Sequence, residues 1–132
     1  MALDYQRKKN NPYFLPNTLY KRVLAVIRDY DRQRSEIVDI LYSLPEKDMT
    51  EVPIDNGTGR PTEKKAIKLS LYQNDVDAVT SALEKIPEEY RNGVFRNIIY
   101  GERFNDTAAY RTWIRNKQKF VFEVAKNLYL IA

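Results

Sequence analysis

The chain has 132 residues, and its 43% hydrophobic and 30% charged residues are typical of a single globular domain. It contains neither cysteine nor histidine, which excludes disulfides, the common zinc sites, cysteine nucleophiles and histidine general bases. No apolar run approaches the roughly twenty residues of a membrane span, and the polar N-terminus lacks the apolar stretch of a secretory signal. We therefore expect a soluble, non-membrane protein.

The charge is unevenly distributed along the chain. Residues 1–22 carry five basic and one acidic side chain, residues 23–102 carry eleven and fifteen, and residues 103–132 carry six and two. The two ends are therefore basic and the middle is acidic. Basic ends on a small domain indicate a polyanionic partner, and an ordinary solvated surface is the alternative interpretation.

Residues 1–15 are predicted to form a basic N-terminal arm, followed by a single helical domain over residues 16–132. Asn17 is a suitable helix cap, and a long helix is expected over residues 16–43. Arg34 is the one polar member of its apolar seam, so we expect it to pair with an acidic side chain or to mark a subunit contact. The spacings of this seam alternate between three and four residues: Tyr20, Val23, Ile27, Tyr30, Arg34, Ile37 and Leu41.

Residues 44–61 are predicted to be the main loop. Gly57 and Gly59 invite comparison with a phosphate-binding loop, but no Gly-Lys-Ser/Thr sequence follows them and no strand is expected before them. Thr62 can cap a second helix over residues 62–86. Because neither long helix can bury its apolar stripe alone, the two should form an antiparallel hairpin, which could also associate with a second copy. The second seam has the same spacing: Leu69, Tyr72, Val76, Val79, Leu83 and Ile86.

Residues 87–132 are expected to form the compact C-terminal helical part. Pro87 suits the first position of a third helix, and Gly101 is a suitable stop. Asp106 can then cap a last helix that runs to about Leu130. Strand signals are weak throughout, so the sequence predicts an all-α fold, with a long helical hairpin followed by these C-terminal helices.

The last helix carries a basic stripe opposite its apolar face. On a helical wheel the apolar face holds Trp113, Phe120, Val121, Val124, Leu128 and Ile131. The opposite face holds no acidic residue and consists of Arg111, Arg115, Gln118, Lys119, Phe122, Lys126 and Tyr129. This pattern fits a helix in a DNA major groove, and the alternative is an ordinary charged face on an amphipathic helix.

In such a pose the side chains divide into two groups. Near the start of the helix, side chains that match purine edges would read bases: Arg111, Thr112, Arg115 and Gln118. Other basic residues would contact the DNA backbone: Arg103, Lys119 and Lys126. Phe122 and Tyr129 fit equally well in a dimer interface.

The C-terminal third resembles phage-encoded regulators of late genes of the RinA and ArpU type. Three segments carry the resemblance: Ile86-Pro87-Glu88-Glu89-Tyr90-Arg91, Arg111-Thr112-Trp113-Ile114-Arg115-Asn116-Lys117 and Val124-Ala125-Lys126-Asn127-Leu128. The resemblance implies a helix-turn-helix like region 4 of sigma factors, and a place in the cytoplasm of a bacterial host. It also implies that Arg111, Thr112, Arg115 and Lys117 contact double-stranded DNA.

The sequence departs from that family at the segment before the last helix. Only about two helical turns fit between Gly101 and Ala109, whereas a helix-turn-helix needs a positioning helix there. Either the helix over residues 88–100 takes this role, or the motif is degenerate. In the second case the fold would lack sequence-specific DNA binding.

Two other classes of function are alternatives to DNA binding. A helical interaction or oligomerisation module would use the hairpin, with Tyr30, Arg34 and Tyr72 as its main contacts. An enzyme is not expected, because adjacent carboxylates such as Glu88 and Glu89 point apart and suit the helix dipole better than acid-base catalysis. Accordingly we expect no cofactor, no metal and no small-molecule substrate.

Overall fold

The computed structural model describes residues 6–43 and 56–132, with side chains from residue 62 onward in the second segment. It is 72% helical, and no strand occurs in the described residues, which confirms the predicted all-α fold. None of the described helices combines the length and the apolar character that a membrane crossing needs. The described residues form five helices: α1 (Asn17–Arg28), α2 (Tyr30–Ser43), α3 (Asn56–Leu83), α4 (Glu88–Tyr100) and α5 (Tyr110–Asn127).

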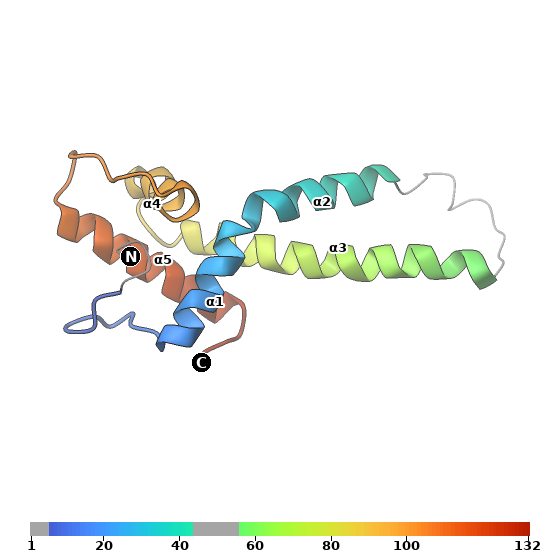
Figure 1. Cartoon of the computed structure of the whole chain (residues 1–132), viewed down its shortest axis with the longest axis horizontal. Helices are drawn as coiled ribbons and strands as arrows, with labels where there is room; N and C mark the ends of the chain where they lie inside the picture. The colour runs from blue at the N-terminus through green and yellow to red at the C-terminus, as the bar shows by residue number, and fades with distance from the viewer. Residues whose placement is uncertain (1–5, 44–55) are drawn as a thin grey trace.

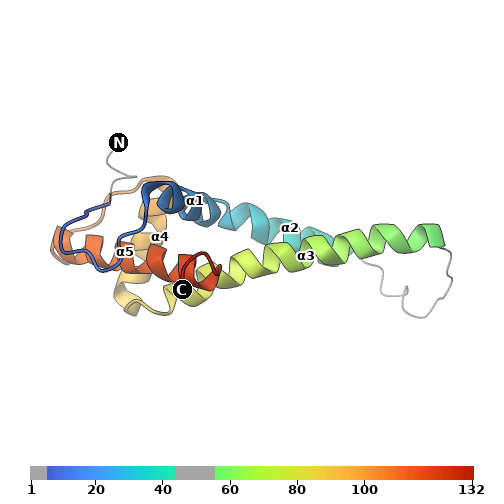
Figure 2. The same cartoon turned by 90° about the horizontal axis from the view of Figure 1, so that it is seen from below.

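The molecule is elongated, with a helical head at one end and a two-helix hairpin at the other (Figures 1 and 2). Helices α1, α4 and α5 and the C-terminal end of α3 form the head. Helix α2 runs antiparallel to α3 and makes up the hairpin. Gln33 holds the two helices together near the head, because its Nε2 donates to Oδ2 of Asp75 at 2.9 Å. The expected hairpin is therefore present.

The long helix expected over residues 16–43 is broken at Asp29, so this prediction was wrong. Asp29 has φ −91° and ψ 3°, and α2 begins at the next residue. Its carboxylate accepts two hydrogen bonds of 2.7 Å from Arg32, where the positive end of the α2 dipole favours a negative charge. Arg28 meanwhile donates from Nε to the carbonyl of Ile98 at 3.0 Å, which ties the end of α1 to α4.

The break changes which face of α2 is buried. Tyr20, Val23 and Ile27 are buried in α1 as the seam predicts. In α2, however, Gln33 and Ile40 are buried, whereas Arg34 is exposed. Leu41, also placed in the seam, keeps 51% of its surface exposed. The expected seam is therefore kept only in part beyond the bend, where Tyr30 and Ile37 are half-buried.

The second hairpin helix begins earlier than expected. Helix α3 begins at Asn56, so Thr62 lies inside it and is not its cap, and it ends at Leu83, three residues before the predicted end. Gly57 and Gly59 therefore lie within helical backbone. The rest of the predicted loop, residues 44–55, lies outside the described residues.

The core of the head surrounds the indole of Trp113. Its ring stacks on Phe104, with centroids 5.1 Å apart and planes 7° apart, and meets the edge of Tyr90 at 5.0 Å. A Cβ on Gly93 of α4 would lie only 2.6 Å from this ring, so the close approach of α4 and α5 needs a glycine there. The predicted apolar face of α5 is confirmed, because Trp113, Phe120, Val121 and Val124 are all buried.

The ends of the last two helices agree with the predictions only in part. Gly101 ends α4 in the left-handed conformation, with φ 72°, as predicted. Helix α5 begins at Tyr110 instead of Asp106, because Asn105 forms a local turn in which its Oδ1 accepts from the Thr107 N–H at 3.0 Å. It ends at Asn127, and Leu130 lies in the turn that follows.

Candidate nucleic-acid interface

Two arginines lie on the exposed side of the first turns of α5. Arg111 and Arg115 are one helical turn apart and both are exposed. Neither forms an ion pair with any residue that the structure describes. The helix begins after Ala109 without a side-chain cap, so no described side chain neutralises its positive end, which lies in the same turn as Arg111. The start of α5 is therefore a place where an anion would be stabilised.

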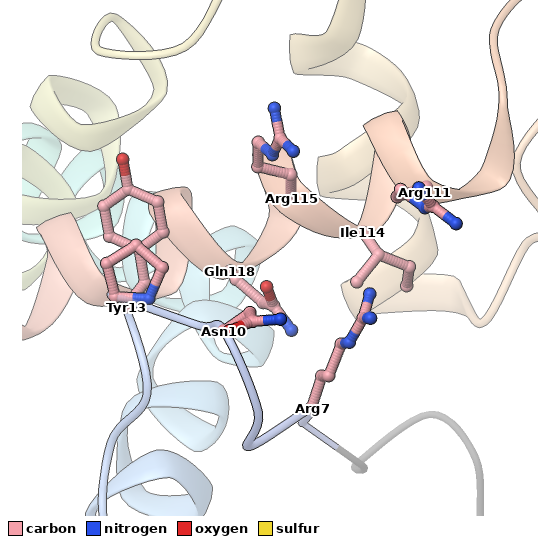
Figure 3. Close-up of a pocket in the computed structure, with 8 residues that line it drawn as sticks. Arg7, Asn10, Tyr13, Arg111, Ile114, Arg115 and Gln118 are labelled. Atoms are coloured by element: carbon pink, nitrogen blue, oxygen red, sulfur yellow. The ribbon is translucent and has the colours of Figure 1, made fainter.

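The N-terminal arm lies against the same part of α5 (Figure 3). Leu15 anchors it in the core of the head, with only 2% of its surface exposed. Gln6 folds the arm back, because its side-chain amide both donates to the Leu15 carbonyl and accepts from the Leu15 N–H. Tyr13 then packs on Phe122 of α5, with ring centroids 5.5 Å apart. These contacts bring Arg7 to the α5 surface.

A pocket of about 450 Å³ lies between the arm and α5, beside the contact of Tyr13 with Phe122. Arg7, Arg111 and Arg115 all line it. Arg7 extends from the arm toward Ile114 of α5, whereas the side chain of Arg115 points away from the arm (Figure 3). No carboxylate lines this pocket, so its charge is positive and uncompensated among the described residues. Its lining consists of Arg7, Asn10, Pro12, Tyr13, Arg111, Ile114, Arg115 and Gln118.

Gln118 lies between the helix and the arm, where its side chain extends toward Asn10 (Figure 3). Only 8% of its surface is exposed, and its Nε2 has no hydrogen-bond partner in the described structure. A buried amide donor without an acceptor is unfavourable by about 1–3 kcal/mol. Asn10 itself has a positive φ of 56°, which bends the arm at this point.

Gln118, expected on the exposed stripe, and Lys117, assigned to DNA contact by the resemblance, are both buried, so neither is exposed as a DNA contact would require. Gln118 lies under the arm and is not open to a base edge. Lys117 is only 5% exposed and donates from Nζ to Oδ1 of Asn97 at 2.9 Å. Asn97 in turn donates from Nδ2 to the Glu102 carbonyl at 2.8 Å. Lys117 therefore connects α5 to the end of α4 instead of facing solvent.

The other predicted DNA contacts do not line the arginine pocket. Thr112 and Lys119 are half-buried, and Arg103 is exposed on the connection between α4 and α5. Lys126 is exposed at the far end of α5, 4.0 Å from Glu123, and lines another pocket together with Asp75 and Asp77. Of the eight predicted contacts, the structure brings Arg111, Arg115 and Gln118 together at one pocket.

The residues predicted to contact a protein partner differ in packing and exposure. Tyr30 packs edge-on against Phe95 at 5.2 Å, and Tyr72 lies beneath the guanidinium of Arg32. Phe122 is partly covered by the arm, as described above. Arg34 is exposed and lies over the ring of Tyr30. Tyr129 follows α5 with a positive φ of 61° and is 91% exposed, so Arg34 and Tyr129 remain open to a partner.

An exposed ion pair closes the turn after α4. The Arg96 guanidinium donates two hydrogen bonds to the Glu102 carboxylate, and this pairing lowers the pKa of Glu102 below its ordinary value. At the hairpin, the hydrogen bond that Tyr100 donates to Asp31 raises the pKa of the tyrosine. Glu102 and Tyr100 lie outside the arginine pocket, so these interactions stabilise the fold and are not part of the candidate site.

The contribution of the arm was missing from the sequence-based site. Arg7, Asn10 and Tyr13 line the pocket, yet the sequence indicated only a basic arm without a partner. No group of acidic residues in the described part of the chain is placed to hold a metal ion. Comparison of the chain with known protein families, with curated proteins and with solved structures gives no match.

Proposed function

We propose that this protein binds DNA through the arginine pocket and the exposed start of α5, as a transcriptional regulator of phage or prophage origin. The observation that carries the proposal is that Arg7, Arg111 and Arg115 line one pocket that has no carboxylate in its lining. Guanidinium groups bind phosphate oxygens with paired, charge-assisted hydrogen bonds. Each neutralised phosphate also releases condensed counterions, which favours binding at low salt.

The geometry favours contacts to the DNA backbone over reading of many bases. Only Arg111 and Arg115 remain exposed among the four expected base readers, because Gln118 is buried and Thr112 is half-buried. The arm also lies along one side of α5, which limits how deeply this helix could enter a groove. We infer that phosphate contacts supply most of the affinity.

The resemblance to RinA and ArpU regulators supports the regulatory part of the proposal. In this interpretation α4 is the positioning helix and α5 the reader helix, which would act in the bacterial cytoplasm. The two are joined by the nine residues 101–109, longer than the three or four of an ordinary helix-turn-helix. Gly93 and Trp113 bring the two helices together across this longer connection.

A titration against duplex DNA at two salt concentrations tests the proposal. Arg111→Ala/Arg115→Ala should bind far more weakly than the wild type, and its salt slope should be smaller by roughly 2 because two phosphate contacts are lost. The matched control is Lys64→Ala/Lys68→Ala, which removes the same charge from exposed positions of α3. Equal affinities of the two double variants, or no binding by the folded wild type at low salt, would show that the proposal is wrong.

The second candidate function is self-association or protein binding through the hairpin. It is favoured by large apolar side chains that α2 and α3 leave exposed: Val38, Leu41, Tyr42, Ile67 and Leu71. Light scattering with Ile67→Glu/Leu71→Glu tests it in a homo-oligomer. A wild-type dimer that becomes monomeric in this variant supports the hairpin as an interface, whereas a monomeric wild type argues against self-association.

A further inference from the structure

We propose that the arginine pocket holds a phosphate monoester, the terminal phosphate of a DNA strand or of a free nucleotide. This inference rests on the proposed function, because it assigns a ligand to the same site. Three arginines, Arg7, Arg111 and Arg115, line the pocket, and Arg111 belongs to the first turn of α5. A phosphate monoester carries a charge close to −2 at neutral pH, whereas each internal phosphodiester carries −1. The monoester therefore matches the uncompensated charge better.

The shape of the pocket agrees with a ligand larger than a bare ion. Its volume of about 450 Å³ lies within the range of small-molecule sites. The apolar part of the wall comes from Pro12, Tyr13 and Ile114. A sugar or a base attached to the phosphate can lie against this wall while the phosphate faces the arginines. A continuous duplex would instead meet the arm, which forms one side of the pocket (Figure 3).

Gln118 provides an independent indication of a ligand. Its side chain is more than nine-tenths buried, extends between α5 and the arm, and leaves Nε2 without an acceptor among the described residues. Packing alone would be served as well by a leucine, which carries no polar group to bury. A phosphate oxygen is an acceptor that this amide can donate to. The buried donor is thus accounted for by an anion in the pocket.

The test compares three forms of one short duplex: with 5′-phosphates, with 5′-hydroxyl ends, and closed by hairpin loops at both ends. We expect the phosphorylated form to bind roughly tenfold more tightly than the other two, which corresponds to one added charge-assisted hydrogen-bonded contact. A nucleoside 5′-monophosphate should displace it more effectively than the corresponding nucleoside. Displacement by inorganic phosphate at the same concentration would indicate that the phosphate alone is recognised.

Two variants connect this preference to the pocket. Gln118→Leu should lose most of the preference for 5′-phosphates without a lower melting temperature, because it removes a donor that has no partner among the described residues. Arg7→Ala should also reduce the preference. Equal binding of all three duplexes by the wild type would overturn the inference and leave the proposed function standing. No binding of any duplex would instead contradict the proposed function. A preference that both variants retain would place the phosphate site elsewhere and overturn the inference.

Discussion

The ammonium group of Lys117 donates a hydrogen bond of 2.9 Å to Oδ1 of Asn97, and both side chains are buried. The bond joins the middle of α5 to the last turn of α4. Asn97 in turn donates a hydrogen bond to the Glu102 carbonyl, so these buried contacts also stabilise the turn after α4. A lysine that sequence patterns place on a DNA surface is therefore part of the scaffold that positions Arg111 and Arg115.

Lys117→Met should lower the free energy of unfolding by about 2–3 kcal/mol, because the substitution leaves the buried Asn97 amide without its charged donor. Urea denaturation measures this change. Lys64→Met, at an exposed position of α3, is the control and should alter stability little. An unfolding free energy equal to that of the wild type would mean that water replaces the lysine. It would contradict a stabilising role for the hydrogen bond between Lys117 and Asn97.

Gly93→Ala should be destabilising by about 1–3 kcal/mol although alanine favours helices. The new Cβ would lie 2.6 Å and 2.8 Å from two atoms of the Trp113 ring. The ring cannot easily move, because Phe104 and Tyr90 hold it on two sides. Denaturation followed by the fluorescence of the single tryptophan reports both the stability and the packing. Asn92→Ala, on the exposed side of α4, should leave both unchanged, and the same result for Gly93→Ala would contradict the close packing described here.

The Arg96–Glu102 pair should contribute to stability only at a sufficiently high pH. Arg96 lowers the pKa of Glu102 below its ordinary value of 4.5, so folding favours the ionised carboxylate. The contribution is complete above that ordinary value and is lost as the pH falls through the lower value of the folded protein. The melting temperatures of the wild type and Glu102→Gln should therefore differ at neutral pH and converge in strong acid. For Glu84→Gln, which removes an exposed carboxylate without an ion pair in the described residues, we expect no such convergence.

Arg7→Ala should reduce the salt dependence of DNA binding by about one ion, because it removes one phosphate contact of the pocket. Lys9→Ala changes the charge of the same arm equally but lies outside the pocket, so its salt dependence should remain close to that of the wild type. Fluorescence anisotropy over a series of salt concentrations measures both slopes. If the two variants behave alike, the arm contributes only general charge and Arg7 has no special position.

The sequence predicted the features that depend on local chemistry and periodicity. Gly101 ends α4 as expected, because only a residue without a side chain takes up φ 72° readily. The apolar face of α5 around Trp113 and Phe120 was also predicted correctly, since its amphipathic period is regular.

The features that depend on tertiary packing were not predictable in this way. A helical wheel gives the angle of Gln118 around α5 but not the arm that covers it. The break at Asp29 likewise depends on the contact of Arg28 with the Ile98 carbonyl, which is 70 residues away in the sequence. Lys117 was assigned to DNA contact because its position matches the motif of the resemblance, and only the position of Asn97 explains why it is buried.

Helix α3 belongs to both halves of the molecule, and this affects how the chain opens. Its 28 residues span about 42 Å, yet among its described side chains, residues 62–83, the buried positions lie at the end near the head, at Ala78, Val79 and Ala82. Toward the hairpin tip, Ile67 and Leu71 keep more than half of their surface exposed, and α2 is the helix that packs on α3. Amide protons should therefore exchange progressively more slowly from the tip of α3 toward its base, so that local unfolding begins far from the arginine pocket and stops before reaching it.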